Sequence, residues 1–297
     1  MGRRAAAARA AGPPRLLSSP ASSCAFFRRM TRRHAINRQG ARRMMCGTRE
    51  RTPVELIVLG CDGSWPGPGG AGSSYLVTSA GFHLVLDLGG GALGRLQEQT
   101  GIADIGAVCV SHAHPDHYAD LFPLSIARYW GGLGATALPL LVPRGFFERV
   151  SHALMPGTAE AWSSTFDMRT LSGGDEHAVG PFSIQTFDMA HVGASLGFRV
   201  SADGTVLAYT GDTGPSDVVS DLAAGADIFL AEATHIDGGE RDFHLTARQT
   251  ARYASVAGVG CLVLTHIEPG VDPAVSLAQA REVFDGTILV AHPGLRI

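Results

Sequence analysis

The amino-acid sequence predicts an α/β fold in which two mixed β-sheets pack together and helices cover their outer faces. Short apolar runs such as residues 54–60 (VELIVLG) and 261–265 (CLVLT) alternate with segments of helical character. Strands this apolar are typically buried on both faces. Alternating patterns around residues 74–87 and 182–200 indicate hairpins, so antiparallel pairs accompany the parallel ones. Helices must then shield the sheet faces that do not contact each other.

In the first half of the chain, glycine and proline separate the predicted elements. The loop at residues 61–73 is rich in both, and residues 89–91 form a glycine turn. Pro115 suits the first turn of the helix that follows a histidine-rich segment. We expect strands at residues 54–60, 74–78, 83–88 and 107–110, and helices at residues 92–100 and 118–130.

The second half continues in the same style. Residues 182–187 and 195–200 alternate between apolar and polar side chains, whereas residues 227–231 (DIFLA) are apolar throughout and indicate a buried strand. We expect strands at residues 138–142, 182–187, 195–200, 206–210, 227–231, 261–265 and 287–290, and helices at residues 144–152, 217–223, 246–257 and 273–284.

The formal net charge of −3 conceals two oppositely charged parts. Residues 1–52 hold 13 arginines and a single acid, Glu50, which gives +12, so the total of −3 leaves −15 for the remainder. An acidic domain does not favour nucleic-acid backbone, because phosphate binding depends on Lys and Arg. We expect residues 1–52 to be a disordered Arg/Ala-rich extension and residues 53–297 to form one folded domain. A translation start at Met30, Met44 or Met45 is favoured equally, and a transit peptide is the third interpretation of the extension.

Cysteine usage and hydropathy predict a cytoplasmic protein. The five cysteines are scattered and form no CxxC pair, which argues against a disulfide framework. No apolar run reaches 18 residues, so we expect no membrane span. No apolar stretch of the kind found in secretory signals follows the arginine pairs.

The strongest local signal is the segment HAHPDH, which places four potential metal ligands within six residues: His112, His114, Asp116 and His117. Imidazole and carboxylate are both good ligands for zinc. His112 and His114 are two residues apart, so they face the same side of an extended segment. Asp116 and His117 lie beyond them and can reach a second metal ion.

Three further candidates follow other predicted strands, namely His191, Asp212 and His266. Each of them alone would be an ordinary turn residue. Their shared position after strands of one α/β domain favours a joint site, because sites in such domains collect at the carboxyl ends of strands. The seven side chains together predict a site for two divalent metal ions, zinc by default, with manganese and iron as alternatives.

This combination resembles the metallo-β-lactamase superfamily over residues 54–297. Asp87 matches the first motif of the family, residues 112–117 the second, and His191, Asp212 and His266 the third to fifth. The resemblance implies a four-layer αββα sandwich. It implies that Asp87 orders the histidine loop without binding metal. It also implies one metal ion held by His112, His114 and His191, a second held by Asp116, His117 and His266, and Asp212 bridging both.

Two metal ions that share Asp212 would also share a water and lower its pKa enough to supply hydroxide near neutral pH. Such a cationic site favours an anionic substrate. A leaving alkoxide needs a proton, and His244 in the segment DFHLT is our candidate donor, with Glu232 at the preceding strand end to hold its imidazole. The alternative for His244 is an exposed helix cap. We count His244, Glu232 and Asp116 as the catalytic residues.

The stretch from residue 231 to 269 (AEATH…DFHLT…THIEP) resembles the ribonuclease Z branch of the family, in which Glu232 and His244 match a proton-donating pair. Ribonuclease Z carries a long basic arm for tRNA, whereas His191 and Asp212 are only 21 positions apart here. The segments LGCDGSWPGPG, DLGGGALG and THIEP are closer to actinobacterial proteins of this branch described as atypical class II cyclic-nucleotide phosphodiesterases.

The favoured function is therefore hydrolysis of a small phosphodiester such as 3′,5′-cAMP. The alternatives are tRNA 3′ processing, another hydrolase of this fold, and a metal-binding or partner-binding domain without activity. Membrane association is not expected, and members of the branch are often homodimers. Trp65 could stack on a base, although we favour a packed loop anchor. His235 either lines the pocket or belongs to a loop.

Overall fold

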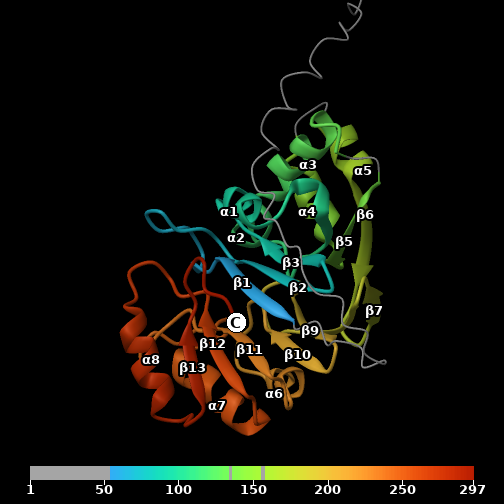
Figure 1. Ribbon diagram of the computed structural model, residues 1–297. Helices are drawn as coiled ribbons and strands as arrows, with labels where there is room; N and C mark the ends of the chain where they lie inside the picture. Colours follow the sequence, from blue (N-terminus) through green and yellow to red (C-terminus); the bar gives the residue numbers. More distant parts are fainter. Residues whose placement is uncertain (1–53, 134–135, 155–157) are drawn as a thin grey trace, which may run out of the picture. The chain divides into compact units, whose positions relative to one another are not determined.

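The computed structural model describes residues 54–133, 136–154 and 158–297. The predictions made for residues 1–52 lie outside the described residues. Two mixed β-sheets form the centre of the described part (Figure 1). The first sheet has the order β1-β2-β3-β4-β5-β6 and the second has the order β13-β12-β11-β10-β9-β8-β7. The strands of the first sheet are β1 (Glu55–Gly60), β2 (Ser74–Ser79), β3 (Phe82–Leu88), β4 (Ile105–Cys109), β5 (Leu138–Pro143) and β6 (Phe166–Leu171).

The second sheet combines an antiparallel half with a parallel half. Strands β7 to β10 pair antiparallel in succession, and β10 to β13 pair parallel. The antiparallel pairs β2–β3 and β8–β9 confirm the predicted hairpins. The strands of the second sheet are β7 (Glu176–Val179), β8 (Phe182–Asp188), β9 (Leu196–Ala202), β10 (Thr205–Tyr209), β11 (Ile228–Glu232), β12 (Cys261–Thr265) and β13 (Thr287–Val290).

Strand β1 shows why the strand sequences are apolar without a break. Leu56 and Val58 point into the core between the two sheets, whereas Ile57 and Leu59 point into the core under the helices of the first sheet. Successive side chains of a strand face opposite sides, so a strand with a core on each side must be apolar at every position.

Helices cover the outer face of each sheet and complete a four-layer αββα sandwich, as predicted. Residues of α1, α3, α4 and α5 pack on the first sheet, and residues of α6, α7 and α8 pack on the second. The helices are α1 (Ala92–Gln99), α2 (Pro115–Tyr118), α3 (Leu121–Trp130), α4 (Phe146–Ser151), α5 (Ala159–Thr165), α6 (Val218–Ala223), α7 (Ala247–Ala257) and α8 (Pro273–Arg281), with a 3₁₀ turn at Ile102–Asp104.

Four features differ from the prediction. The helix expected at residues 118–130 is divided into α2 and α3, and α2 already begins at Pro115. Helix α5 and the strands β6 and β7 were not predicted. Both strands lie at the ends of their sheets, and most side chains of β7 are not buried. Edge strands carry little apolar signal because only part of their surface meets the core.

The carboxyl ends of several strands converge on one edge of the sandwich. The histidine loop follows β4, His191 follows β8, Asp212 follows β10, Glu232 ends β11 and His266 follows β12. The parallel pairing of β10, β11 and β12 places three of these ends side by side. In the described part of the chain, no helix is long and apolar enough to cross a membrane.

Candidate metal centre

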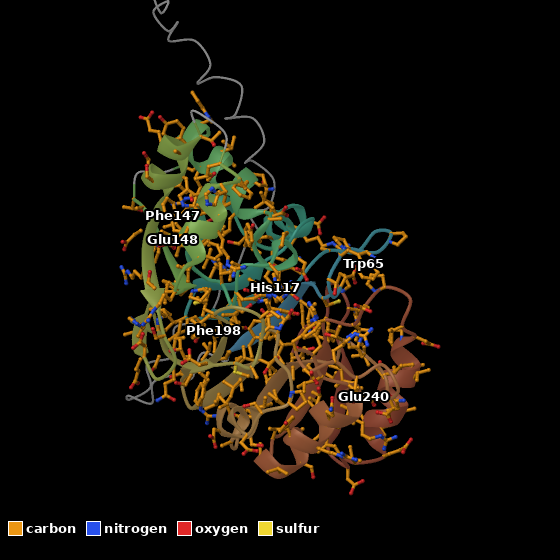
Figure 2. All side chains as sticks on the ribbon, turned by 180° about the vertical axis from the view of Figure 1, so that it is seen from behind. Trp65, His117, Phe147, Glu148, Phe198 and Glu240 are labelled. Atoms are coloured by element: carbon orange, nitrogen blue, oxygen red, sulfur yellow. The ribbon has the colours of Figure 1, made fainter. Side chains whose placement is uncertain are left out.

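The structure brings the seven predicted ligands together in two clusters. The first cluster consists of His112, His114, His191 and Asp212, and the second consists of Asp116, His117, Asp212 and His266. Within each cluster the ligand atoms all lie within 4.8 Å of one another, and Asp212 belongs to both. His117 lies centrally, where the segments meet (Figure 2). The predicted convergence of separate segments is therefore present in the fold, and the roles of the individual residues stay predictions.

In the first cluster, nitrogen and oxygen atoms surround one point. His114 Nδ1 lies 2.9 Å from His112 Nε2 and 3.3 Å from His191 Nε2. Asp212 Oδ2 lies 3.5 Å from His112 Nε2 and 3.9 Å from His191 Nε2. A tetrahedral zinc ion with ligands at about 2.1 Å separates its ligand atoms by roughly 3.4 Å. The observed separations are close to that spacing.

The second cluster fits the same spacing. His266 Nε2 lies 3.2 Å from both His117 Nε2 and Asp116 Oδ2, and His117 Nε2 lies 3.5 Å from Asp116 Oδ2. The other carboxylate oxygen of Asp212, Oδ1, lies 3.2 Å from His117 Nε2 and 3.3 Å from His266 Nε2. One carboxylate thus directs one oxygen to each cluster, the geometry expected of a bridging ligand.

The buried Asp212 Oδ1 atom is close to the Nε2 atoms of His117 and His266, but neither contact has hydrogen-bond geometry. A buried carboxylate oxygen without a partner carries a large desolvation cost. A cation between Asp212, His117 and His266 would remove that cost, because it would be coordinated by this oxygen and two imidazole nitrogens. This unpaired atom and the donor set of both clusters fit a pair of divalent metal ions.

Burial and neighbouring charges shift the pKa values of the ligands in directions that suit metal binding. Burial lowers the pKa of His112 well below its ordinary value, so this imidazole is neutral and free to bind metal. Burial would also lower the pKa of His117, but Asp212 and Asp87 outweigh it and hold that pKa well above its usual range. Burial alone would raise the pKa of Asp212. The neighbouring His117, His266 and His112 outweigh burial and hold that pKa well below its usual range, so this carboxylate is ionised.

Metal binding should release about one proton per chain near neutral pH, because a metal ion must displace the proton that His117 retains between its two carboxylates. Since protons compete with metal for this imidazole, metal affinity should fall as the pH decreases below the His117 pKa. Calorimetry in buffers of different ionisation enthalpy measures the released proton directly. Binding without proton release would show that His117 is already neutral in the metal-free protein.

Asp87 contacts the histidine loop at Ser111 and at His117. This carboxylate is fully buried and accepts hydrogen bonds from the Ser111 backbone N–H at 2.6 Å and from the Tyr209 hydroxyl at 2.6 Å. His117 Nδ1 lies 2.8 Å from Asp87 Oδ2, which leaves His117 Nε2 to face the second cluster. The Asp87 backbone has φ 55°, a left-handed conformation that Asp and Asn tolerate better than most residues.

The substitution Asp87→Asn should weaken zinc binding by about 10- to 100-fold, because the loss of charge removes the partner that orients His117. Asparagine keeps the side-chain size and accepts the left-handed backbone, so the fold should persist. Zinc affinity can be measured by competition with a chromogenic chelator. Asp227→Asn, at an exposed residue that accepts a hydrogen bond from the Val206 backbone, is the matched control. Equal affinities for the Asp87 variant and the wild type would contradict this assignment.

Two other candidate ligands, His191 and His266, are oriented by groups that no sequence motif marks clearly. His191 Nδ1 lies 2.9 Å from the backbone carbonyl of Phe243, so its Nε2 faces the first cluster. His266 Nδ1 lies 2.9 Å from the Thr234 hydroxyl, and His266 itself has φ 55°. The Phe243 carbonyl could not be identified from the sequence because every residue has one. Thr234 has only its place in the segment EATH as a signal.

Glu232 and His244 form a buried pair beside the two clusters. His244 Nδ1 lies 3.1 and 3.2 Å from the two carboxylate oxygens of Glu232, and neither side chain is exposed as a helix cap would be. Burial would lower the pKa of His244, but the hydrogen bond and charge of Glu232 outweigh it and raise that pKa above its ordinary value. The His244 ring centroid lies 5.2 Å from that of His191 and 5.6 Å from that of His266.

Glu232 also connects the pair to the metal ligands. Its carboxylate accepts hydrogen bonds from the backbone N–H groups of Thr213 and Leu245, at 2.5 and 3.1 Å, and from the Thr234 hydroxyl at 2.6 Å. Glu232, His244 and His266 also lie close enough to hold a metal ion. We interpret them as a hydrogen-bond network, because Thr234 lies between Glu232 and His266 Nδ1.

The sequence alone allows two interpretations each for Trp65 and His235, and the structure places both residues. Trp65 is 51% exposed on the loop after β1, so the favoured interpretation as a packed anchor is wrong (Figure 2). His235 is partly buried, with its ring centroid 5.6 Å from that of His244 and its Nδ1 3.7 Å from a carboxylate oxygen of Glu268. It therefore borders the Glu232–His244 pair and is not part of either cluster.

Comparison with known proteins identifies the family. The family model described as the beta-lactamase superfamily domain matches residues 85–267. This segment includes Asp87, the histidine loop and all the downstream candidate ligands. The chain belongs to the metallo-β-lactamase superfamily. It is a metal-dependent hydrolase, and divalent metal ions are the cofactors used in this superfamily.

Relatives within the superfamily cover most of this chain. An uncharacterized protein of Mycobacterium tuberculosis, Rv1339, is 36% identical over 79% of this chain and 88% of its own length. Ribonuclease Z of Mycobacterium bovis is 29% identical over 80% of this chain and 96% of its own length. These similarities are consistent with the predicted ribonuclease Z-like branch.

Solved metallo-β-lactamase structures share the fold. The crystal structure of YhfI from Bacillus subtilis has a TM-score of 0.76 and 24% identity, and the match covers 83% of this chain and 99% of that protein. A diphosphatase of the PhnP family has a TM-score of 0.64 and 19% identity over 82% of this chain and 97% of its own. At these identities the comparison shows the fold alone.

Proposed function

We propose that this protein hydrolyses the phosphodiester bond of small nucleotides and that 3′,5′-cAMP is a substrate. The reaction would use two divalent metal ions bound by the protein, with zinc as the favoured metal. The observation that carries the proposal is the bridging geometry of Asp212, which directs one oxygen to each cluster while the Glu232–His244 pair lies beside both. When bound, the metal ions would lower the pKa of a shared water and offset the charge of a phosphate group.

The residues of the chain supply proton transfer to the leaving group. Because the pKa of His244 is raised, the imidazole is protonated to a larger extent at neutral pH than a free histidine. Its Nδ1 is held by Glu232, and its Nε2 has no hydrogen-bond partner in the described part of the chain. A proton on Nε2 can therefore pass to the oxygen that leaves.

The local topology favours a small substrate. The segment between His191 and Asp212 contains only the hairpin β9–β10, and two residues, Asp203 and Gly204, connect its strands. The basic arm expected of ribonuclease Z has no counterpart there. The 29% identity with ribonuclease Z over nearly the full length of that enzyme keeps tRNA 3′ processing as the second candidate.

A substrate panel separates these functions. The full-length protein, loaded with zinc or manganese, is assayed on 3′,5′-cAMP, bis(p-nitrophenyl) phosphate and a precursor tRNA. Turnover of cAMP with no tRNA cleavage supports the proposal. Turnover of only the aryl phosphodiester contradicts the nucleotide assignment, and efficient cleavage of the precursor tRNA favours the second candidate.

A further inference from the structure

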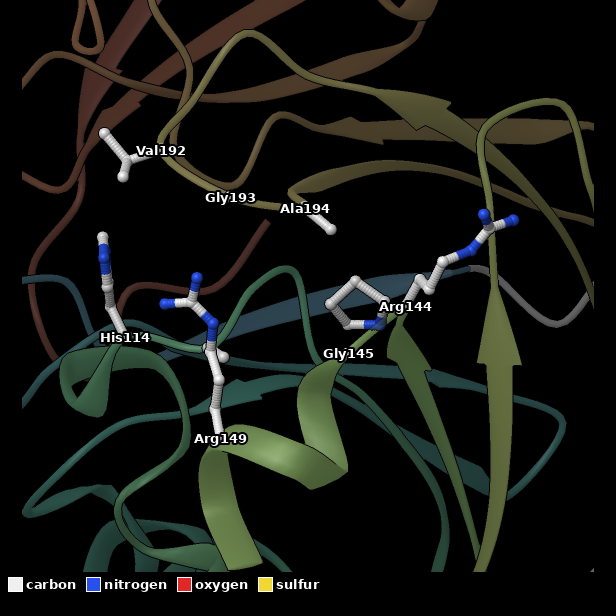
Figure 3. A pocket seen from close by; sticks show the side chains of 9 residues that line it. His114, Arg144, Gly145, Arg149, Val192, Gly193 and Ala194 are labelled. Atoms are coloured by element: carbon white, nitrogen blue, oxygen red, sulfur yellow. The ribbon is translucent and has the colours of Figure 1, made fainter. Parts of the chain in front are cut away.

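A small pocket adjoins the first cluster on the side of His114. It lies between the histidine loop, the start of α4 and the loop that follows His191 (Figure 3). Two arginines, Arg144 and Arg149, are among its lining residues, and no acidic residue lines it. The pocket therefore has a positive lining in a domain whose overall charge is negative.

Of the two arginines that line this pocket, Arg149 is the one whose guanidinium has no hydrogen-bond or ion-pair partner among the described residues. Arg144 donates a hydrogen bond to the Ser172 hydroxyl at 3.3 Å. Its guanidinium points away from Arg149 and His114 (Figure 3). The Arg149 guanidinium instead lies between His114 and Ala194 in the close-up view. Its side chain makes no hydrogen bond or ion pair with any residue that the structure describes. A planar guanidinium with all its donors free is well suited to bind a phosphate.

The loop opposite Arg149 adds further donors. Residues 192–194 are exposed, and their backbone N–H groups donate no hydrogen bond to the backbone of any described residue. Gly193 has φ +84°, and a Cβ atom placed there would lie 3.3 Å from Arg149 Nη2. The glycine therefore lets the loop approach the guanidinium closely. Successive unpaired N–H groups beside a cation form an environment that favours anions.

The pocket is separate from the place where the reacting phosphate would bind. Of the seven candidate ligands, only His114 lines it, whereas Asp212, which bridges both clusters, does not. A group bound at Arg149 would thus neighbour the metal centre without replacing the phosphate that reacts there.

We propose that Arg149 and residues 192–194 form a subsite for a second phosphate group of the substrate. This inference rests on the proposed phosphodiesterase function. It extends the proposed substrates to nucleotides that carry a phosphate in addition to the one that is hydrolysed. A cyclic mononucleotide with a single phosphate would leave the subsite empty.

Calorimetry on the metal-loaded, full-length protein tests this subsite with two ligands, adenosine 5′-monophosphate and adenosine 3′,5′-bisphosphate. Wild-type protein should bind the bisphosphate about tenfold more tightly, as expected for one charge-assisted contact. In Arg149→Ala this preference should disappear while the monophosphate affinity stays the same. Arg149→Lys should keep part of the preference, because lysine provides charge without the planar donor pair.

Arg252→Ala is the matched control, since Arg252 is exposed on α7 and its loss changes the net charge equally. An equal preference in wild type and Arg149→Ala, or an equal loss in Arg252→Ala, would overturn the subsite. Hydrolysis of cAMP is measured on the same samples. Its absence while the binding preference persists would refute the proposed function and not the subsite, whereas hydrolysis without the preference would refute only the subsite.

Discussion

Replacing Asp212 with alanine should lower kcat on phosphodiester substrates by on the order of 10³-fold and reduce the bound metal from two ions per chain to one or none. The carboxylate directs Oδ1 to the second cluster and Oδ2 to the first, so its removal takes a ligand from both. It also leaves the buried imidazoles of His112 and His117 without the negative charge that they surround. Steady-state kinetics and elemental analysis of the same preparation measure both effects.

Two control variants show whether the charge or the bulk of Asp212 matters. Asp212→Asn keeps the size of the side chain and should retain more metal than the alanine variant, while its activity stays far below wild type. Asp221→Ala removes an exposed carboxylate on α6 and should change neither activity nor metal content. An Asp212→Ala protein with two bound metal ions and undiminished activity would contradict the bridging role.

Replacing His244 with alanine should lower kcat by about 10²- to 10⁴-fold on substrates whose leaving group is an alkoxide, because such a group needs a proton. The loss should be much smaller on bis(p-nitrophenyl) phosphate, since p-nitrophenolate leaves without protonation. Glu232→Gln should act in the same direction, because it removes the charge that raises the pKa of His244. Kinetics on the two substrate types therefore separates proton donation from a structural role.

The neighbouring His235 provides the control for this series. Its ring lies close to that of His244, but it belongs to neither cluster of candidate metal ligands and makes no hydrogen bond or ion pair with Glu232. His235→Ala should therefore preserve activity on both substrate types. A loss of equal size on alkyl and aryl substrates in His244→Ala would show that His244 positions other residues and does not donate the proton.

The central strands could be predicted from the sequence because their burial on both faces leaves a continuous apolar run, as in β1 and β12. The edge strand β7 could not, because only Val179 of its four side chains is buried and the strand therefore lacks a continuous apolar run. The helix expected at residues 118–130 is divided into α2 and α3, and this division also depends on tertiary contacts. Asp120 there accepts a hydrogen bond from the Leu93 backbone, and sequence periodicity does not register such a contact.

The seven clustered side chains could be predicted because metal chemistry restricts their residue types and the fold restricts their position after strands. The groups that orient them could be predicted only in part. Asp87 was identified through the family motif, whereas the Phe243 carbonyl and the Thr234 hydroxyl depend on loops whose paths the sequence does not specify. Arg149 was missed for the same reason, because helix α4 approaches the loop after His191 only in the folded chain.

Anomalous X-ray scattering from crystals grown with zinc tests the central claim most directly. We expect two zinc peaks about 3.5–4 Å apart, the usual separation in two-metal sites. One should lie among His112, His114 and His191, the other among Asp116, His117 and His266, and one oxygen of Asp212 should bind each. A single peak, or peaks that do not contact Asp212, would show that Asp212 does not bridge two metal ions.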